Sequence, residues 1–220
     1  MGLTEENALP AAEPQVGFGQ DEFPEQNDHQ HYEVLQQLGD CYTCVGDYER
    51  AQRCYEKAAE LEPDDAQPYV GLGVAALQQD RLEEAELAFR VACRLDADCA
   101  KAYAGRAMVA QQRRDYKAAF ELYLKCLELD VDNLTALLGL FQTSCRMNSF
   151  ARVIHYLELY LEGHPGDTSV MFSLAALYSR QNRLEQARKM LLDVLTLEPH
   201  NTDATDLLEE VEHRLAQARR

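Results

Sequence analysis

Apolar and polar residues alternate along most of this chain with the spacing of amphipathic helices. From Tyr32 onward, apolar side chains recur at intervals of three and four residues, which places them on one face of a helix. The pattern predicts helices over 32–45 and 48–61, and the same pair of helices recurs at a constant offset of 34 residues. Five such units are expected, over 32–65, 66–99, 100–133, 134–167 and 168–201.

The first unit shows the repeating frame most clearly. Its fixed positions are Leu38, Gly39, Tyr42, Ala51, Tyr55, Ala58 and Pro63, and small residues among them allow two helix backbones to approach closely. Turns within the units are expected at Gly46, Asp80, Arg114, Asn148 and Asn182, four of which are residue types that tolerate a left-handed conformation. Helix N-caps are expected at Asp65, Asp98, Asp132, Asp167 and Asn201.

This frame resembles the tetratricopeptide repeat (TPR) family, whose unit of 34 residues is a helix–turn–helix. The resemblance covers about residues 32–201. It implies an all-α fold, a right-handed α-solenoid of five repeats. It also implies a repeat protein that acts through protein–protein interaction, as an adaptor or scaffold.

Residues 202–220 are expected to form a C-terminal capping helix. Leu207, Leu208, Val211 and Leu215 make one apolar stripe, and the opposite face is charged. A solenoid needs such a helix to cover its open end. A coiled-coil dimer is the alternative, but the segment has only two or three heptads.

The fourth unit departs from the frame. Phe141, Val153 and Tyr160 stand where the other units mostly have small residues. Larger side chains at these positions are expected to push neighbouring helices apart and to change the superhelical twist between residues 134 and 165.

Composition separates residues 1–31 from the repeats. This stretch contains seven acidic residues, three prolines and no Lys or Arg, which predicts a disordered acidic N-terminal tail. The whole chain has 38 Asp plus Glu against 21 Lys plus Arg, so neither a nucleic acid nor an anionic membrane surface is an expected partner. No signal peptide and no membrane-spanning run is recognisable, which favours a cytoplasmic location.

The seven cysteines raise the question of a metal or redox site. Cys41 and Cys44 have C-x-x-C spacing, but the predicted helix places them in its interior, and no second pair completes a zinc site. His29 and His31 are the only nearby histidines. Cys41 is expected to be a buried packing residue, and Cys44 to be exposed. No metal or cofactor is predicted, although a thiol or metal sensor remains the least favoured alternative.

No catalytic motif is present. The chain has no phosphate-binding loop, no nucleophile elbow and no H-E-x-x-H sequence, and its paired carboxylates are adjacent on helices, where they point in different directions. The protein is therefore predicted not to be an enzyme.

The family resemblance implies that the first helix of each unit lines a concave groove where a partner peptide docks. In the first unit the groove positions are polar: Glu33, Gln36, Gln37, Asp40, Thr43 and Cys44. In the later units the expected groove residues are Val70, Gly71, Val74, Leu77, Gln78, Lys101, Ala104, Gly105, Met108, Gln111, Gln112, Leu138, Gly139, Gln142, Arg146, Phe172, Ser173, Ala176 and Arg180. Many of these are apolar, and an exposed apolar patch usually marks an interface.

The best-known binding mode of the family holds the partner's C-terminal carboxylate with Lys, Asn and Arg side chains. Only Lys101 stands at such a position here, so this clamp is not expected. Gly71, Gly105 and Gly139 share the sixth position of three successive units, although glycine inside a helix costs about 1 kcal/mol relative to alanine. Two explanations are open: close approach of a bound peptide, or tight packing between neighbouring first helices.

The sequence therefore predicts a chaperone-like binder or adaptor that holds an amphipathic helix or an apolar peptide of another protein in its groove. The alternative is a self-assembling scaffold, a homo-oligomer in which the N-terminal tail or the C-terminal helix mediates association. In that case Phe18 and Phe23 of the tail would occupy the groove.

Overall fold

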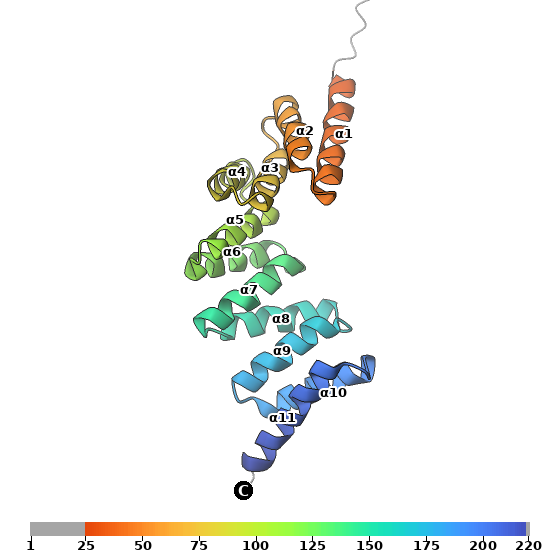
Figure 1. The fold of residues 1–220 in the computed structure, drawn as a ribbon, viewed down its shortest axis with the longest axis vertical. Helices are drawn as coiled ribbons and strands as arrows, with labels where there is room; N and C mark the ends of the chain where they lie inside the picture. The colour runs from red at the N-terminus through yellow and green to blue at the C-terminus, as the bar shows by residue number, and fades with distance from the viewer. Residues whose placement is uncertain (1–24, 219–220) are drawn as a thin grey trace, which may run out of the picture.

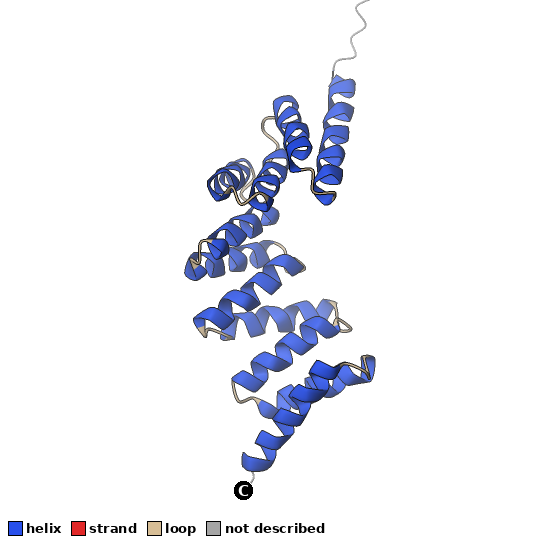
Figure 2. Cartoon of the chain, viewed as in Figure 1, coloured by secondary structure: helices blue, strands red, loops and turns tan. Residues whose placement is uncertain are grey.

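The computed structural model describes residues 25–218, and within this range the chain is entirely helical, with no strand (Figures 1 and 2). The helices are α1 (Glu25–Cys44), α2 (Tyr48–Leu61), α3 (Gln67–Gln78), α4 (Leu82–Leu95), α5 (Ala100–Gln112), α6 (Tyr116–Leu129), α7 (Leu134–Met147), α8 (Ala151–Gly163), α9 (Thr168–Arg180), α10 (Leu184–Leu197) and α11 (Thr202–Ala218). Each helix packs on the next, and the ribbon descends as a staircase from α1 to α11. This is the α-solenoid of helix pairs that the sequence predicts. None of the helices in this range is both long and apolar enough to cross a membrane.

The turn inside each unit has one residue in the left-handed region of backbone space. Gly46, Asp80, Arg114, Asn148 and Asn182 have φ between 54° and 79°, at the five positions expected from the frame. Left-handed backbone places Cβ close to the following carbonyl oxygen, which is why glycine, asparagine and aspartate dominate such positions. Arg114 adopts the same conformation, with a φ of 62°, without that advantage.

The helix caps agree with the sequence prediction at two of five boundaries. Asp167 and Asn201 accept hydrogen bonds from the backbone N–H groups of Val170 and Ala204. The prediction was wrong at α5 and α7, whose caps are Cys99 and Asn133. At α3 the cap residue is Ala66, but the predicted Asp65 accepts a hydrogen bond from the backbone N–H of Gln67, the first residue of the helix, at 2.8 Å. In each case the cap is the residue next to the unit boundary, whatever its type. Among Ala66, Cys99 and Asn133, only Asn133 supplies a capping side chain.

The N-terminal boundary of the repeats is also different from the prediction. Helix α1 begins at Glu25, so residues 25–31, which were assigned to the tail, are helical. One contact that holds this extension is made by the His29 ring, whose Nδ1 lies 3.3 Å from a carboxylate oxygen of Glu62 in the turn after α2. Residues 1–24, the rest of the predicted acidic tail, lie outside the described residues.

Unit four has a looser backbone arrangement than the others. The backbones of α7 and α8 approach each other at far fewer places than those of the paired helices in the other units, and α8 packs similarly loosely on α9. Val153 and Tyr160 of α8 are buried where other units have small residues, and Phe141 of α7 is partly buried against the same core. The predicted separation of helices in this unit is confirmed; the accompanying change of twist stays a prediction.

Helix α11 closes the C-terminal end. Ala204 and Val211 are fully buried, and Leu207, Leu208 and Leu215 pack partly buried against the same core, which extends back through α9 and α10. Arg214 donates hydrogen bonds to Ser179 Oγ and the Ser179 carbonyl, at 2.8 and 3.1 Å. The capping prediction is therefore confirmed for the described part of this segment.

Candidate functional site

Two hollows lie along the face formed by the first helices of the units. The central hollow has a volume of about 770 Å³ and lies between α5 and α7, over the start and middle of α6. The N-terminal hollow has a volume of about 660 Å³ and lies mainly between α1 and α3. The linings of the two hollows differ in polarity, so the polarity of the groove changes along its length.

The central hollow combines apolar side chains with amides held in place. Met108 on α5 with Leu138 and Phe141 on α7 supply much of its apolar lining. Beneath them, the Tyr123 hydroxyl donates to Gln111 Oε1 at 2.8 Å, and Gln111 Nε2 donates to Gln142 Oε1 at 2.9 Å. These two hydrogen bonds orient both amides. Gln142 takes part only as an acceptor, through its Oε1 atom, and its NH₂ group is not used in them.

Burial keeps the Tyr123 hydroxyl protonated to a higher pH than an exposed tyrosine would allow. Removal of its side chain from water raises the pKa of Tyr123 to about 12, because the phenolate is poorly solvated there. The hydroxyl is protonated at neutral pH, as a tyrosine ordinarily is, and it donates to Gln111. The unit before it has Phe89 at the equivalent position, with no hydroxyl to hold a polar side chain.

The N-terminal hollow is more acidic. The Tyr55 hydroxyl donates to Asp40 Oδ1 at 2.7 Å and lies 3.2 Å from Thr43 Oγ1. Burial, above all, raises the pKa of Tyr55 above its usual range, so it stays a donor. Val70 and Val74 form an apolar wall of this hollow, and Lys101 is the one cationic side chain among the described residues that line it.

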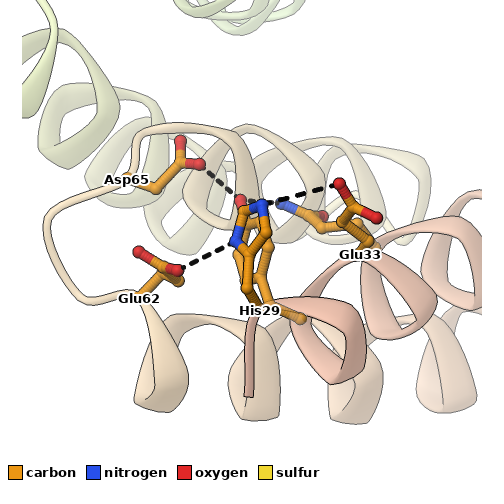
Figure 3. A network of polar contacts seen from close by, with 6 residues as sticks. His29, Glu33, Glu62 and Asp65 are labelled. Atoms are coloured by element: carbon orange, nitrogen blue, oxygen red, sulfur yellow. Dashed lines mark hydrogen bonds and ion pairs between the residues drawn. The ribbon is translucent and has the colours of Figure 1, made fainter. Parts of the chain in front are cut away.

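A polar network includes three residues that line this hollow, Tyr32, Glu33 and Asp65 (Figure 3). The His29 ring lies between Glu62 and Glu33, with its two nitrogens 3.3 and 3.6 Å from their carboxylates. It also stacks on the ring of Tyr32, whose hydroxyl donates to Asp65. Burial and the neighbouring Asp65 raise the pKa of Tyr32 to about 12, although a bond from Gln36 opposes the shift. The network ties α1 to the turn that follows α2.

Eleven of the predicted groove residues line one of the two hollows. Met108, Gln111, Gln112, Leu138, Gly139, Gln142 and Arg146 line the central hollow, although Gly139 is largely buried. Val70, Gly71, Val74 and Lys101 line the N-terminal hollow, although Val70 and Gly71 are largely buried. These eleven residues remain the candidate site.

The other predicted groove residues lie elsewhere. Leu77, Ala104 and Gly105 are buried in the packing between helices and offer no surface to a partner, so the prediction was wrong for them. Gln78, Phe172, Ser173, Ala176 and Arg180 line neither hollow. Phe172 packs against the core, and the Arg180 guanidinium lies over the Phe150 ring, 5.9 Å from its centre.

The three glycines at the sixth position have a different role from either explanation offered by the sequence. A Cβ atom at Gly71 would lie 2.4 Å from the ring of Tyr55, and one at Gly105 would lie 2.3 Å from the ring of Phe89. Each glycine therefore makes room for an aromatic ring on the second helix of the preceding unit. At these positions the glycines therefore accommodate the protein's own aromatic rings, although Gly71 and Gly139 also line the two hollows.

Sequence reasoning missed the aromatic residues of the site. Tyr116, Tyr123 and Phe141 line the central hollow, and Tyr32 and Tyr55 line the N-terminal one. Three of them lie on second helices, which the family pattern assigns to the outer layer. The available signal was the hydroxyl group itself, because a tyrosine at a buried frame position requires a polar partner nearby.

The cysteines differ in their exposure to solvent. Cys41 and Cys44 are both exposed in the last turn of α1, so the predicted burial of Cys41 was wrong. Cys99 and Cys126 are buried, and burial raises the pKa of the Cys126 thiol to about 12. Within residues 25–218, no three His, Cys, Asp or Glu side chains are grouped in a way that could hold a metal ion.

Comparison with known proteins identifies the repeat and the fold. Models of the tetratricopeptide repeat match residues 45–98, 100–133 and 170–197, together more than half of the chain. The chain is similar in structure to PilF of Pseudomonas aeruginosa, with a TM-score of 0.68 and 19% identity over 87% of this chain and 93% of that one. No curated protein sequence is detectably similar to it.

Two further solved structures have the same fold. MamA (residues 41 to the end) from Desulfovibrio magneticus RS-1 has a TM-score of 0.60 and 16% identity, over 78% of this chain and 97% of that one. YrrB, described as a TPR protein with an unusual peptide-binding site, has a TM-score of 0.60 and 20% identity, over 78% of this chain and 89% of that one. At these identities the likeness concerns the fold.

Proposed function

Because this chain belongs to the tetratricopeptide repeat family, we propose that it is a non-enzymatic adaptor that binds a segment of another protein along the face of its first helices. The segment would be an amphipathic helix or an apolar peptide. Its apolar side chains would enter the central hollow, and its polar groups would bond to the fixed amides at the rim.

The central hollow is the observation that carries this proposal. Leu138 is 44% exposed there, beside the partly buried Met108 and Phe141, so the hollow presents apolar surface to water. Burial of apolar surface stabilises a complex by about 25 cal/mol per Å². Peptide binding is also the stated property of YrrB, which supports a peptide as the ligand class.

Amides that are already oriented favour specific binding. Gln111 is held by Tyr123, and Gln142 is held by Gln111, so neither has to be ordered when a partner arrives. Arg146 lies at one end of the hollow and supplies a positive charge there. A docked segment with a carboxylate near Arg146 is therefore favoured over a segment with a positively charged side chain there.

A direct test uses a display library of random 16-residue peptides selected on the immobilised protein. Enriched peptides are then measured by titration against the wild type and Leu138→Glu. A carboxylate in the central hollow is expected to weaken binding at least about tenfold, because the charge would lose water when the peptide docks.

The matched control is Leu192→Glu. Leu192 is 42% exposed on α10, so the substitution makes the same chemical change at the same exposure outside the hollows. It is expected to leave binding unchanged. Equal binding of the enriched peptides to wild type and Leu138→Glu would refute the proposed site.

A further inference from the structure

Helix α1 carries an exposed apolar stripe on the face that points away from the rest of the solenoid. Val34, Leu38 and Val45, the residue after the helix, are 51%, 43% and 77% exposed, and Cys41 is exposed between them. Their spacing of four, three and four residues places them on one side of a helix. This stripe is separate from the groove, whose α1 residues lie on another side.

The same face is covered in every later unit. The tenth position of the unit, which is Cys41 in the first, is Ala75, Val109, Thr143 and Leu177 in the others, and all four are fully buried. In each case the second helix of the preceding unit packs on that first helix, as α2 does on α3. The cover is always the segment that comes just before the helix in the chain. Within residues 25–218, α1 has no such cover.

We propose that residues 16–23 cover this stripe as an extended strap. Phe18 lies seven residues before Glu25 and can span about 23 Å, whereas Leu38 lies about 20 Å along the helix from Glu25. By the same arithmetic Val16 and Val45 are each about 30 Å from Glu25. The reach of the strap and the position of the stripe therefore match.

The sequence of the strap suits this role. Val16 and Phe18 are two residues apart and so point to the same side of an extended chain. Pro24 cannot continue the helix toward its N-terminus as an interior residue, and it favours extended conformations at Phe23, which suits an extended strap. Because the strap is tethered to α1, its effective concentration is on the order of millimolar, which favours it over a second copy of the chain.

The two exposed cysteines of α1 allow a site-resolved test. Cys41 lies in the stripe, whereas Cys44 lines the N-terminal hollow and serves as an internal control. Alkylation by N-ethylmaleimide is followed at each cysteine by peptide mass spectrometry, in the full chain and in a Val16→Ser/Phe18→Ser variant. The variant is expected to react about tenfold faster at Cys41 and at an unchanged rate at Cys44. A tenfold change corresponds to about 1.4 kcal/mol in the free energy with which the strap binds the stripe.

A third chain, Leu9→Ser, changes an apolar residue outside the strap and is expected to keep the wild-type rate at both cysteines. Equal Cys41 rates in wild type and the Val16→Ser/Phe18→Ser variant would overturn the proposal. Protection of Cys41 that rises with protein concentration and survives in the variant would also overturn it, because a second copy would then be the cover. Parallel acceleration at Cys41 and Cys44 would indicate opening of α1 and would equally count against the strap.

Discussion

At the scale of single residues, the units are held together by aromatic rings placed between glycines. Phe89 of α4 is fully buried, and Cβ atoms added at Gly73 and Gly105 would approach its ring to 2.6 and 2.3 Å. Gly73 belongs to the same unit as the ring, and Gly105 belongs to the next. One side chain therefore packs against two successive first helices at backbone distance, which links adjacent units directly.

This arrangement predicts that Gly105→Ala destabilises the protein. Alanine is favoured over glycine in a helix by about 1 kcal/mol, but overpacking a close-packed core costs about 1–3 kcal/mol. Phe89 is fully buried between the two helices, so we expect a net loss of about 1 kcal/mol in the free energy of unfolding. Denaturant titration followed by circular dichroism measures it.

Gly163→Ala is the matched control for this prediction. Gly163 ends α8, and a Cβ atom there would meet nothing within 4 Å. The substitution is expected to be neutral or slightly stabilising. If Gly105→Ala were as stable as the wild type, the ring between two glycines would not be a link between the units.

At the scale of helices, the two ends of the solenoid differ in how the apolar surface of the terminal helix is covered. At the C-terminus, α11 lays an apolar stripe on α9 and α10 and anchors it with Arg214. At the N-terminus, α1 leaves the corresponding kind of surface open within the described residues. A terminal helix with one polar face is what allows a repeat array to end without exposing its core.

Helix α11 is therefore expected to stabilise the last unit through its buried residues. Val211 is fully buried, and Val211→Ala should lower the free energy of unfolding by about 1–3 kcal/mol through loss of packing and formation of a cavity. Gln217→Ala, on the exposed side of the same helix, should change it by less than about 0.5 kcal/mol. Thermal unfolding of both variants distinguishes them. A Val211→Ala protein that changed its oligomeric state at unchanged stability would instead support the coiled-coil alternative.

The helices were largely predictable from the sequence, because their signals are local. The spacing of apolar residues places ten helices in a 34-residue frame, and residues such as Asn148 and Asn182 place the turns. What escaped prediction depends on neighbours in space. Cys41 is exposed because no unit precedes it, and Gly105 is buried because Phe89 lies beneath it. The hydroxyl of Tyr123 enters the groove from a second helix, which the repeat pattern alone does not indicate.

At the scale of the whole molecule, the buried apolar residues form unequal clusters. The largest runs continuously from Ala104 to Val211, a second centres on Phe89, and the first unit has a small separate one made by Tyr32, Leu35 and Ala58. In a repeat protein each unit contacts only its neighbours, so local stability follows the local core. Unit four tests this idea, because its helices are separated but its large side chains fill the space.

Amide hydrogen exchange followed by mass spectrometry is expected to show the least protection in α1 and α2 and the most in α5, α6, α9 and α10. If side-chain burial decides local stability, α8 will be protected nearly as well as α6, because Val153, Ile154 and Leu157 are buried in the same large cluster. If backbone proximity decides it, α8 will exchange first, since α7 and α9 pack on it only loosely. We expect the former, because the free energy of burial scales with the apolar area removed from water and not with the distance between helix axes. Exchange of α8 before α1 would contradict this and would place the weak point of the solenoid in its fourth unit.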